Sequence, residues 1–397
     1  MGNRSNAMAK KVSSGESKTR QSNFEALRIF AMLLIISFHV ILHAAIPQLS
    51  SSQFFAEPAF AKKLLLFQAF KTFGSIGNAI FILIAGYFLI EAKKIDLKKQ
   101  VVKIFSQLLF GICFMVLLVF VMYCFQPQII EAVKKTGIEI QLQEKMFGAV
   151  TLQSVNSFSW FLGYYLAVIF IAELFLKKRL AQLSKNQYLT GIICVGALIT
   201  FAFTIGFFNA LLAGKDSLSQ IVMGTFLFMV GGYIKLYNPF KNIKAIWLII
   251  LILLAYCFLF IGFYNTTMSN IAKFTNGLSN KFEQSILGTD NISFFTVLVS
   301  VAIFELFRRL NISNIKSVNY LASATLTIYL LHDNEFMYSF YRMVDWPMLL
   351  HETPLRMTVY LAVYTLIIFA YGVVIYAGYR LFLRLVNKKP SGMLRLE

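Results

Sequence analysis

Ten apolar runs of membrane-spanning length, separated by short charged segments, constrain this chain more than any other feature of its sequence. Roughly 20 apolar residues cross the hydrocarbon core of a bilayer as one α-helix, because a helix satisfies its own backbone hydrogen bonds there. The runs lie near residues 25–46, 68–90, 103–125, 158–176, 188–208, 218–236, 245–264, 292–307, 318–332 and 357–380. The predicted fold is all-α, a polytopic integral membrane protein of about ten transmembrane helices.

The composition agrees with a chain surrounded by membrane lipids. Hydrophobic residues make up 58% and charged residues only 14%, against about 45–50% and 25% in soluble domains. The formal net charge of +19 sits in short clusters between the apolar runs and forms no continuous stripe, so nucleic acid is not an expected partner.

The distribution of Lys and Arg predicts the orientation. With the N-terminus inside, alternate loops place 25 of these residues on the inner side and 11 on the outer side. Cytoplasmic loops carry this excess, so both termini are predicted to be cytoplasmic and the chain to be a multi-pass protein of the plasma membrane. The ninth run is the shortest and is polar in its first half, so it either tilts into a cavity or continues past His332.

The domain organisation predicted from these patterns is simple. Residues 1–22 are basic and polar and are expected to form a disordered cytoplasmic tail. Residues 23–387 form one transmembrane domain, and residues 388–397 form a second cytoplasmic tail. The four cysteines lie in or at the ends of apolar runs without CxxC spacing, and we interpret them as packing residues.

The first run contains two residues that are costly at membrane depth, Arg28 and His39. At about 100° and 1.5 Å per residue, eleven residues bring His39 to within roughly 20° of the face of Arg28 and about 16–17 Å further along the helix. Arg28 is either functional or an interfacial cation paired with Glu25. His39 is either functional or a hydrogen-bonded packing histidine.

A metal site is not expected here. His39 and His43 have i, i+4 spacing, which places two ring nitrogens on one helix face, but the run lacks the glutamate of a zinc protease and no third ligand lies nearby. His43 is interpreted as an interface residue.

Four stretches, in order, are similar to one known family. The run from Phe24 to His39 resembles the opening signature of the membrane-bound acyltransferase-3 family, in which an arginine and ten further residues precede an essential histidine. Residues 74–89 are similar to its second-helix pattern, although Ala85 replaces the usual serine. That departure excludes a catalytic hydroxyl at position 85, and it leaves a packing role for Gly86.

The other two matching stretches lie later in the chain. Residues 159–162, Ser-Trp-Phe-Leu, resemble the family's entry into its fourth span, and Trp160 is read equally as an aromatic-belt anchor. Residues 326–334 resemble the late Tyr-Leu-x-His motif and include Tyr329 and His332. The alternative places Tyr329 in the aromatic belt and leaves His332 as a helix end.

The resemblance implies transfer of an acyl group, usually acetyl, from cytoplasmic acyl-CoA to a hydroxyl of an extracytoplasmic or lipid-linked cell-surface polysaccharide. It implies that His39 acts as general base or is itself transiently acylated. His332 and Tyr329 are expected beside it, and Trp160 is expected to contact the acceptor. The phosphates of acetyl-CoA are expected to bind a cationic mouth, which is the group of charged residues at the cytoplasmic end of the first helices. Its expected members are Arg28, Glu25, Lys99 and Lys103, with Lys93, Lys94 and Lys98 nearby. The alternative is that these lysines only mark an ordinary cytoplasmic loop.

Two other classes compete with an enzyme. A transporter or flippase for a lipid-linked or sugar substrate also places polar residues at the midplane, but it predicts polar groups spread over several broken helices. Here interior runs such as 249–263 are almost uniformly apolar. A purely structural membrane protein gives no reason for an arginine and a histidine on one face.

Overall fold

The computed structural model describes residues 20–51, 60–125, 128, 152–205, 216–277 and 293–387, and it confirms the all-α class: these residues form helices and no strand. Each of the ten apolar runs lies largely within helix. The first is α2 (Ser22–Val40), which continues through a π-helical turn (Ile41–Ala45) into α3 (Ile46–Ser51). The next elements are α4 (Ala61–Lys71), α5 (Phe73–Leu89), α6 (Leu97–Phe125) and α9 (Leu152–Ile171), followed by a second π-helical turn (Ala172–Leu176).

The remaining elements complete the bundle. They are α10 (Lys177–Gln182), α11 (Lys185–Ile205), α13 (Asp216–Tyr237), α14 (Ala245–Thr275), α15 (Phe294–Arg309), α16 (Lys316–Ser323), α17 (Thr325–His332), α18 (Glu335–Arg342), a 3-10 turn (Pro347–His351) and α19 (Pro354–Asn387). Six described stretches are long and apolar enough to cross a membrane: 22–49, 63–89, 97–122, 220–237, 245–273 and 354–386. Ten spans and cytoplasmic termini stay predictions.

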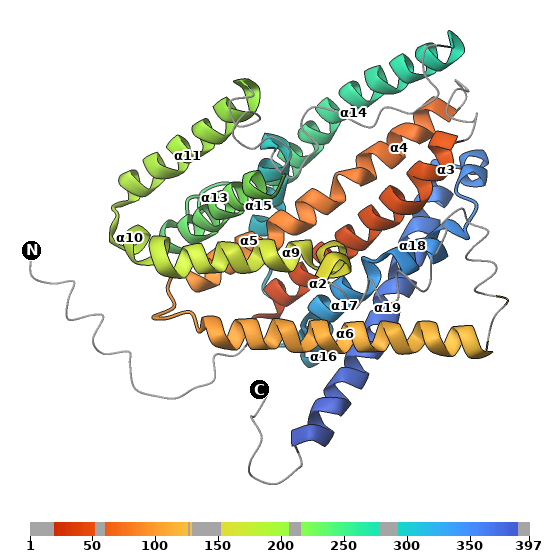
Figure 1. Ribbon diagram of the computed structural model, residues 1–397. Coiled ribbons are helices and arrows are strands. Elements are labelled where there is room, and N and C mark those ends of the chain that lie inside the picture. Colours follow the sequence, from red (N-terminus) through yellow and green to blue (C-terminus); the bar gives the residue numbers. More distant parts are fainter. Residues whose placement is uncertain are drawn as a thin grey trace, which may run out of the picture.

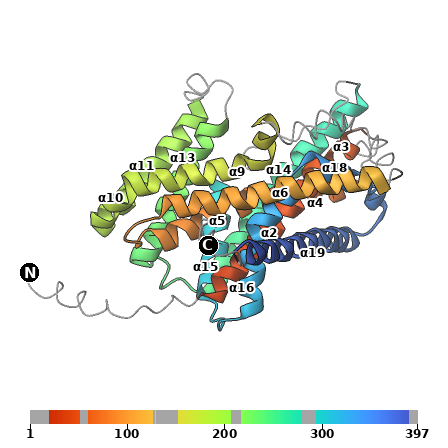
Figure 2. The ribbon, with the colours of Figure 1, turned by 60° about the horizontal axis from the view of Figure 1, so that its bottom comes forward.

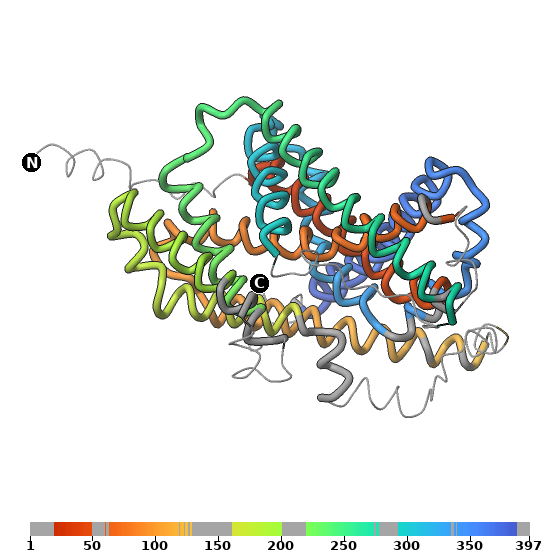
Figure 3. The backbone as a smooth tube through the Cα atoms, turned by 90° about the horizontal axis from the view of Figure 1, so that it is seen from above, coloured from red at the N-terminus to blue at the C-terminus, as the bar shows by residue number. Residues whose placement is uncertain are grey.

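Helices α2 and α5 lie at the centre of the molecule and separate two groups of neighbours (Figure 1). On one side, α13 and α15 pack against them around a core that includes Leu27, Ile80 and Phe228. On the other side, α17 and α19 pack on α2 around a core that includes Ile36 and Tyr329. Helix α14 lies at the top of Figure 1 and α6 near the bottom, and the view from above shows α14 crossing over the middle of the molecule (Figure 3).

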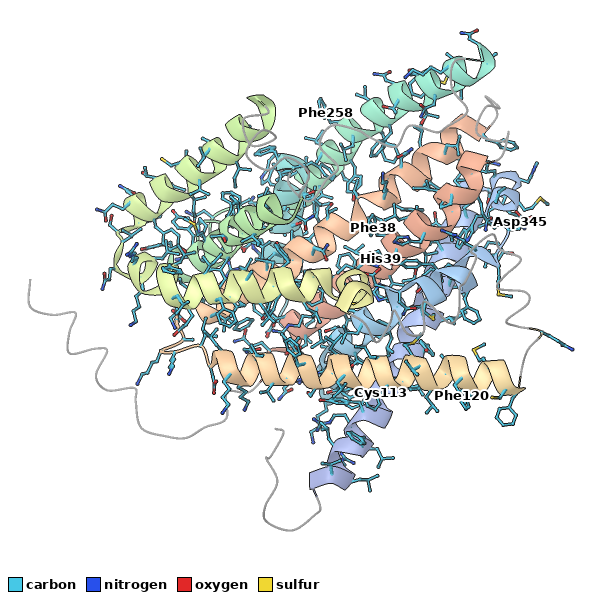
Figure 4. All side chains as sticks on the ribbon, viewed as in Figure 1. Phe38, His39, Cys113, Phe120, Phe258 and Asp345 are labelled. Carbon is cyan, nitrogen blue, oxygen red and sulfur yellow. The ribbon has the colours of Figure 1, made fainter. Side chains whose placement is uncertain are left out.

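Helices α6 and α14 present large apolar side chains outward. Phe120 on α6 is 56% exposed and Phe258 on α14 is 78% exposed (Figure 4). Exposed apolar surface of this extent is stable only when something apolar covers it, and a lipid bilayer does so. The four cysteines belong to this exposed surface as well, so the interpretation of them as packing residues is wrong.

Close contact between α5 and α13 depends on glycines. A Cβ added at Gly86 would lie 2.2 Å from the carbonyl oxygen of Phe228, and one added at Gly231 would lie 2.3 Å from that of Leu83. Small residues allow helix backbones to approach closely within a membrane. The packing role predicted for Gly86 is therefore confirmed.

The start of α2 is fixed by hydrogen bonds to the segment between α15 and α16, which lies at one end of the bundle (Figure 2). Ser22 Oγ donates to Asn319 Oδ1 at 2.9 Å and accepts from the amide of Ile315 at 2.8 Å. The Asn23 amide donates to the carbonyl oxygens of Phe307 and Arg308 in the last turn of α15. Carbonyl groups in a last helical turn lack the usual partner four residues on, and this contact supplies one. These bonds hold α2 in register with its neighbours.

The ninth predicted span is interrupted twice. Its helix is broken at Ala324, between α16 and α17, and α17 ends at His332, where Asp333 leaves the helical conformation. A continuous helix past His332 is therefore wrong. Helix α17 turns its polar side chains inward, since Thr327 donates to Gln107 of α6 at 2.9 Å and is fully buried.

Candidate active site

Two histidines from distant parts of the chain meet in the interior. His39 lies near the end of α2, two residues before the π-helical segment, and His332 is the last residue of α17. The Nδ1 atom of His39 lies 2.9 Å from Nε2 of His332, and the two side chains are 5% and 1% exposed. His39 lies near the centre of the molecule (Figure 4). The structure thus brings together two of the three predicted catalytic residues.

The hydrogen bonds of His332 determine where the protons of the neutral pair lie. His332 Nδ1 is 2.9 Å from the carbonyl oxygen of Ile328, which only accepts, so this nitrogen carries the proton. Its Nε2 is then an acceptor, and His39 Nδ1 must donate to it. This leaves Nε2 of His39 with an unprotonated lone pair, which is the state a general base requires.

Asp333 completes the cluster. Its Oδ1 lies 3.7 Å from His39 Nδ1. The phenol of Tyr329 donates to its Oδ2 at 3.2 Å, and Tyr338 donates to Oδ1. The carboxylate is 3% exposed and is positioned to stabilise a positive charge on His39. Tyr329, the third predicted catalytic residue, therefore holds Asp333, while its ring lies 5.8 Å from that of His332.

A second layer of contacts fixes the end of α17. Tyr341 donates to the carbonyl oxygen of His332 at 2.8 Å, and the indole of Trp346 donates to the carbonyl oxygen of Tyr341 at 2.7 Å. His43 stacks on Tyr338 with ring centroids 3.6 Å apart. His43 lies on the π-helical turn, and its ring centroid is 5.8 Å from that of His39. His43 therefore borders the histidine pair.

The residues predicted to bind the CoA phosphates include Arg28 and Glu25, which lie at the other end of α2. One Nη of Arg28 lies 3.0 Å from both carboxylate oxygens of the buried Glu25. The remaining guanidinium nitrogens have no hydrogen-bond partner among the residues that the structure describes, and the side chain is 34% exposed. Lys103 lies within electrostatic range of Arg28, Glu25 and Lys99. Arg28 is thus both ion-paired and open to a further anion.

The helix face between Arg28 and His39 is filled. Met32 and Ile35 lie between them and are each 1% exposed, and they pack in the same core as Tyr329. The predicted face is real, because α2 is one unbroken helix from Ser22 to Val40. A ligand that extends along this face would have to displace side chains such as Met32.

Two of the sequence predictions cannot be placed. Trp160 belongs to α9, but its side chain lies outside the described part of the structure. Residues 1–19 and 388–397 of the predicted tails also lie outside it. Within the described ranges, no three His, Cys, Asp or Glu side chains gather as a metal site would require.

Sequence reasoning missed the roles of Asp333 and Tyr338. The Asp-Asn pair after His332 is visible in the motif, but nothing local indicates that its carboxylate faces α2. Tyr338 follows on a separate helix, α18, whose start is capped by Asn334 accepting from the amide of Met337. Only the turn at Asp333 and Asn334 brings its phenol back to the carboxylate.

A bundle of apolar helices that encloses hydrogen-bonded histidines and a carboxylate defines a membrane-embedded protein equipped for proton transfer. The model of the acyltransferase domain that defines the acyltransferase-3 family matches residues 21–394. The chain therefore belongs to this family and is a membrane acyltransferase. No curated protein and no solved structure matches the chain in the corresponding comparisons.

Proposed function

We propose that the protein transfers an acetyl group from cytoplasmic acetyl-CoA to a hydroxyl of an extracytoplasmic or lipid-linked cell-surface polysaccharide in the plasma membrane. The observation that supports this most is the proton arrangement of the histidine pair, which leaves Nε2 of His39 free to accept a proton. Acyl transfer to a hydroxyl needs one such base.

In the proposed reaction, His39 Nε2 takes the proton of the acceptor hydroxyl while its oxygen attacks the thioester carbonyl carbon. A carbon–oxygen bond forms, the carbon–sulfur bond breaks, and the proton passes from His39 to the departing thiolate. Asp333, at 3.7 Å, stabilises the transient imidazolium. In the alternative route, Nε2 itself attacks the thioester carbonyl carbon, the carbon–sulfur bond breaks and the thiolate departs. The acceptor hydroxyl oxygen then attacks the acyl-histidine, the carbon–nitrogen bond breaks, and the hydroxyl proton passes to the thiolate.

Arg28 at the cytoplasmic end of α2 is proposed to bind a CoA phosphate with the guanidinium nitrogens that Glu25 does not engage. The distance of about 16–17 Å from Arg28 to His39 along the helix is of the order that a pantetheine arm spans. Because Met32 and Ile35 fill the face between them, donor binding would require these side chains to move.

The donor and acceptor are tested with membranes that contain the protein. Acetyl-CoA labelled in its acetyl group should transfer label to the glycan and lipid-linked glycan fractions, whereas CoA labelled in its adenine should transfer none. Butyryl-CoA and palmitoyl-CoA serve as competitors and establish the acyl group preferred. Cells without the gene should lack acetyl esters on one envelope polysaccharide. Unchanged polysaccharide acetylation in those cells would contradict the proposed acceptor.

We expect Arg28→Ala to weaken acetyl-CoA binding about tenfold or more, because a charge-assisted phosphate contact contributes about 1.5–3 kcal/mol. Arg28→Lys should recover only part of it, since an ammonium cannot make a bidentate contact. The measurement is the acetyl-CoA dissociation constant of the purified protein. Lys316→Ala, an exposed lysine on α16, is the control. Equal affinity in all variants would return Arg28 to the role of an interfacial cation paired with Glu25.

A transporter or flippase remains the second candidate function, and one observation bears on it. Helix α17 is interrupted at both ends and carries buried polar side chains, as broken transporter helices do. Membership of an acyltransferase family favours the enzyme, and the labelled-acetyl experiment separates the two.

A further inference from the structure

Helix α6 carries a stripe of residues at four-residue spacing, which places them on one helix face. Its members are Lys103, Gln107, Gly111 and Met115. The hydroxyl of Thr327, the Cβ of Leu330 and the side chain of Leu331 lie along the last three of these positions. The stripe therefore faces α17, and we call the contact between the two helices the α6–α17 seam.

Gln107 is the residue of this seam whose hydrogen bonds are only half made. It lies in a stretch of α6 that is long and apolar enough to cross a membrane, and it is 3% exposed. Its amide oxygen accepts from the hydroxyl of Thr327 at 2.9 Å, whereas no described residue accepts from its amide nitrogen. A polar group without a partner is costly at such a position. An amide NH2 group only donates, so the missing partner is an acceptor.

The seam begins where the donor phosphates are proposed to bind. Its first member, Lys103, lies within electrostatic range of Arg28. From Lys103 the stripe rises four residues to Gln107, and α17 rises five more from Thr327 to its end at His332. At 1.5 Å per residue this path is about 13–14 Å long. A pantetheine arm is of that order of length, and its two amide carbonyls are acceptors of the kind that Gln107 lacks.

The seam can open at lower cost than the filled face of α2. Met32 on α2 is 1% exposed and belongs to the core that α2 shares with α17 and α19. Helix α6, near the bottom of Figure 1, instead turns Leu109 and Leu117 outward, 64% and 58% exposed. Gly111 adds no side chain to the seam, and a Cβ placed there would meet only Leu330, at 3.8 Å. An outward movement of α6 therefore admits a linear ligand while the core around Met32 stays packed.

We infer that the α6–α17 seam is the path of the pantetheine arm of the donor, with the amide nitrogen of Gln107 donating to one of its amide carbonyls. This inference rests on the proposed function, since it assigns a path to the acetyl-CoA of that reaction. Gln107 is a specificity residue in this view, because it distinguishes a donor with a pantetheine arm from a nucleotide that has only the phosphates. The arm brings the thioester to the level of His332 and His39.

The first test measures the binding of two ligands to the purified protein. Acetyl-CoA is compared with adenosine 3′,5′-bisphosphate, which keeps the phosphorylated nucleoside and lacks the arm. Gln107→Met keeps the length of the side chain and removes the amide, so it should weaken acetyl-CoA binding about tenfold, the equivalent of about one hydrogen bond. The bisphosphate should bind this variant and the wild type equally, because it does not reach Gln107.

Thr327→Val is the matched control. It removes the hydroxyl that donates to Gln107 and leaves the amide nitrogen of Gln107 in place. Acetyl-CoA should bind it within about twofold of wild type, since no contact with the arm is lost. Equal weakening by both substitutions, with a matching fall in melting temperature, would make the pair a packing contact only and overturn the inference. Unchanged acetyl-CoA binding by Gln107→Met would overturn it as well.

A disulfide across the seam tests whether it opens. The Cβ positions of residues 111 and 330 are 3.8 Å apart, a separation typical of a disulfide. Gly111→Cys combined with Leu330→Cys, in a chain whose four native cysteines are replaced by alanine, should lose acetyl-CoA binding on oxidation and regain it on reduction. The bisphosphate should bind in both states, and each single variant should not respond to oxidation. Full acetyl-CoA binding by the disulfide-bonded protein would overturn the path.

The outcome for the proposed function is separate. If the double variant does not insert or does not form the disulfide, the comparison of Gln107→Met with Thr327→Val decides the inference. If wild-type protein binds acetyl-CoA and acetylates the envelope glycan while the seam variants have no effect, only the path fails. If the wild type binds neither acetyl-CoA nor the bisphosphate, the proposed donor fails and the path fails with it.

Discussion

Replacement of His39 by alanine is expected to reduce acetyl transfer by about 10²- to 10⁴-fold, the usual contribution of a positioned general base. The protein should still insert and fold, because α2 is held by its apolar contacts and by Ser22 and Asn23 at its start. The measurement is kcat with labelled acetyl-CoA in membranes. The acetyl-CoA dissociation constant should remain close to wild type, since His39 lies far from the cationic mouth.

Two variants sharpen this result. His39→Gln keeps an amide that can donate to His332 but supplies no base, so it should be as inactive as His39→Ala. His351→Ala removes an exposed histidine whose ring packs edge-on against Phe60, and it should keep full activity. Turnover by His39→Ala within a fewfold of wild type would remove His39 from the chemistry.

Replacement of His332 by alanine is expected to lower kcat about 10- to 100-fold, as loss of a group that orients another commonly does. Without His332 Nε2, Nδ1 of His39 loses its acceptor at 2.9 Å; Asp333 Oδ1, at 3.7 Å, is beyond hydrogen-bond distance, so the ring can rotate or adopt the other tautomer. His332 is in this view a positioning residue. His332→Gln supplies a carbonyl oxygen that accepts from His39 Nδ1, and it should restore a substantial part of the loss.

The rescue distinguishes positioning from packing. A merely structural role would make both variants lose thermal stability and activity together, whereas a positioning role makes kcat follow the presence of the acceptor atom. Asp333→Asn adds a second readout: it keeps acceptor and donor atoms for Tyr329 and Tyr338 but removes the charge. It should lower kcat while leaving the acetyl-CoA dissociation constant unchanged. Equal kcat in His332→Ala and His332→Gln would argue against positioning.

Local information in the sequence was enough to determine the helices. Apolar runs of spanning length predict helix because a membrane leaves the backbone no other way to satisfy its hydrogen bonds, and each predicted run lies largely within helix. The shared face of Arg28 and His39 also follows from helix geometry alone, because α2 is continuous. The packing role of Gly86 and the motif around His332 were readable for the same reason: each depends on a short stretch of chain.

Only the tertiary structure decided which side chains meet. His39 and His332 are 293 residues apart and touch because α2 and α17 pack together, and helix packing is determined by the shapes of whole faces. The charge partner Asp333 and the phenol of Tyr338 depend on a turn that a continuous ninth helix would have removed. The filled face between Arg28 and His39 arises in the same way, because burial of a side chain is a property of its neighbours in space and leaves no mark in the local sequence.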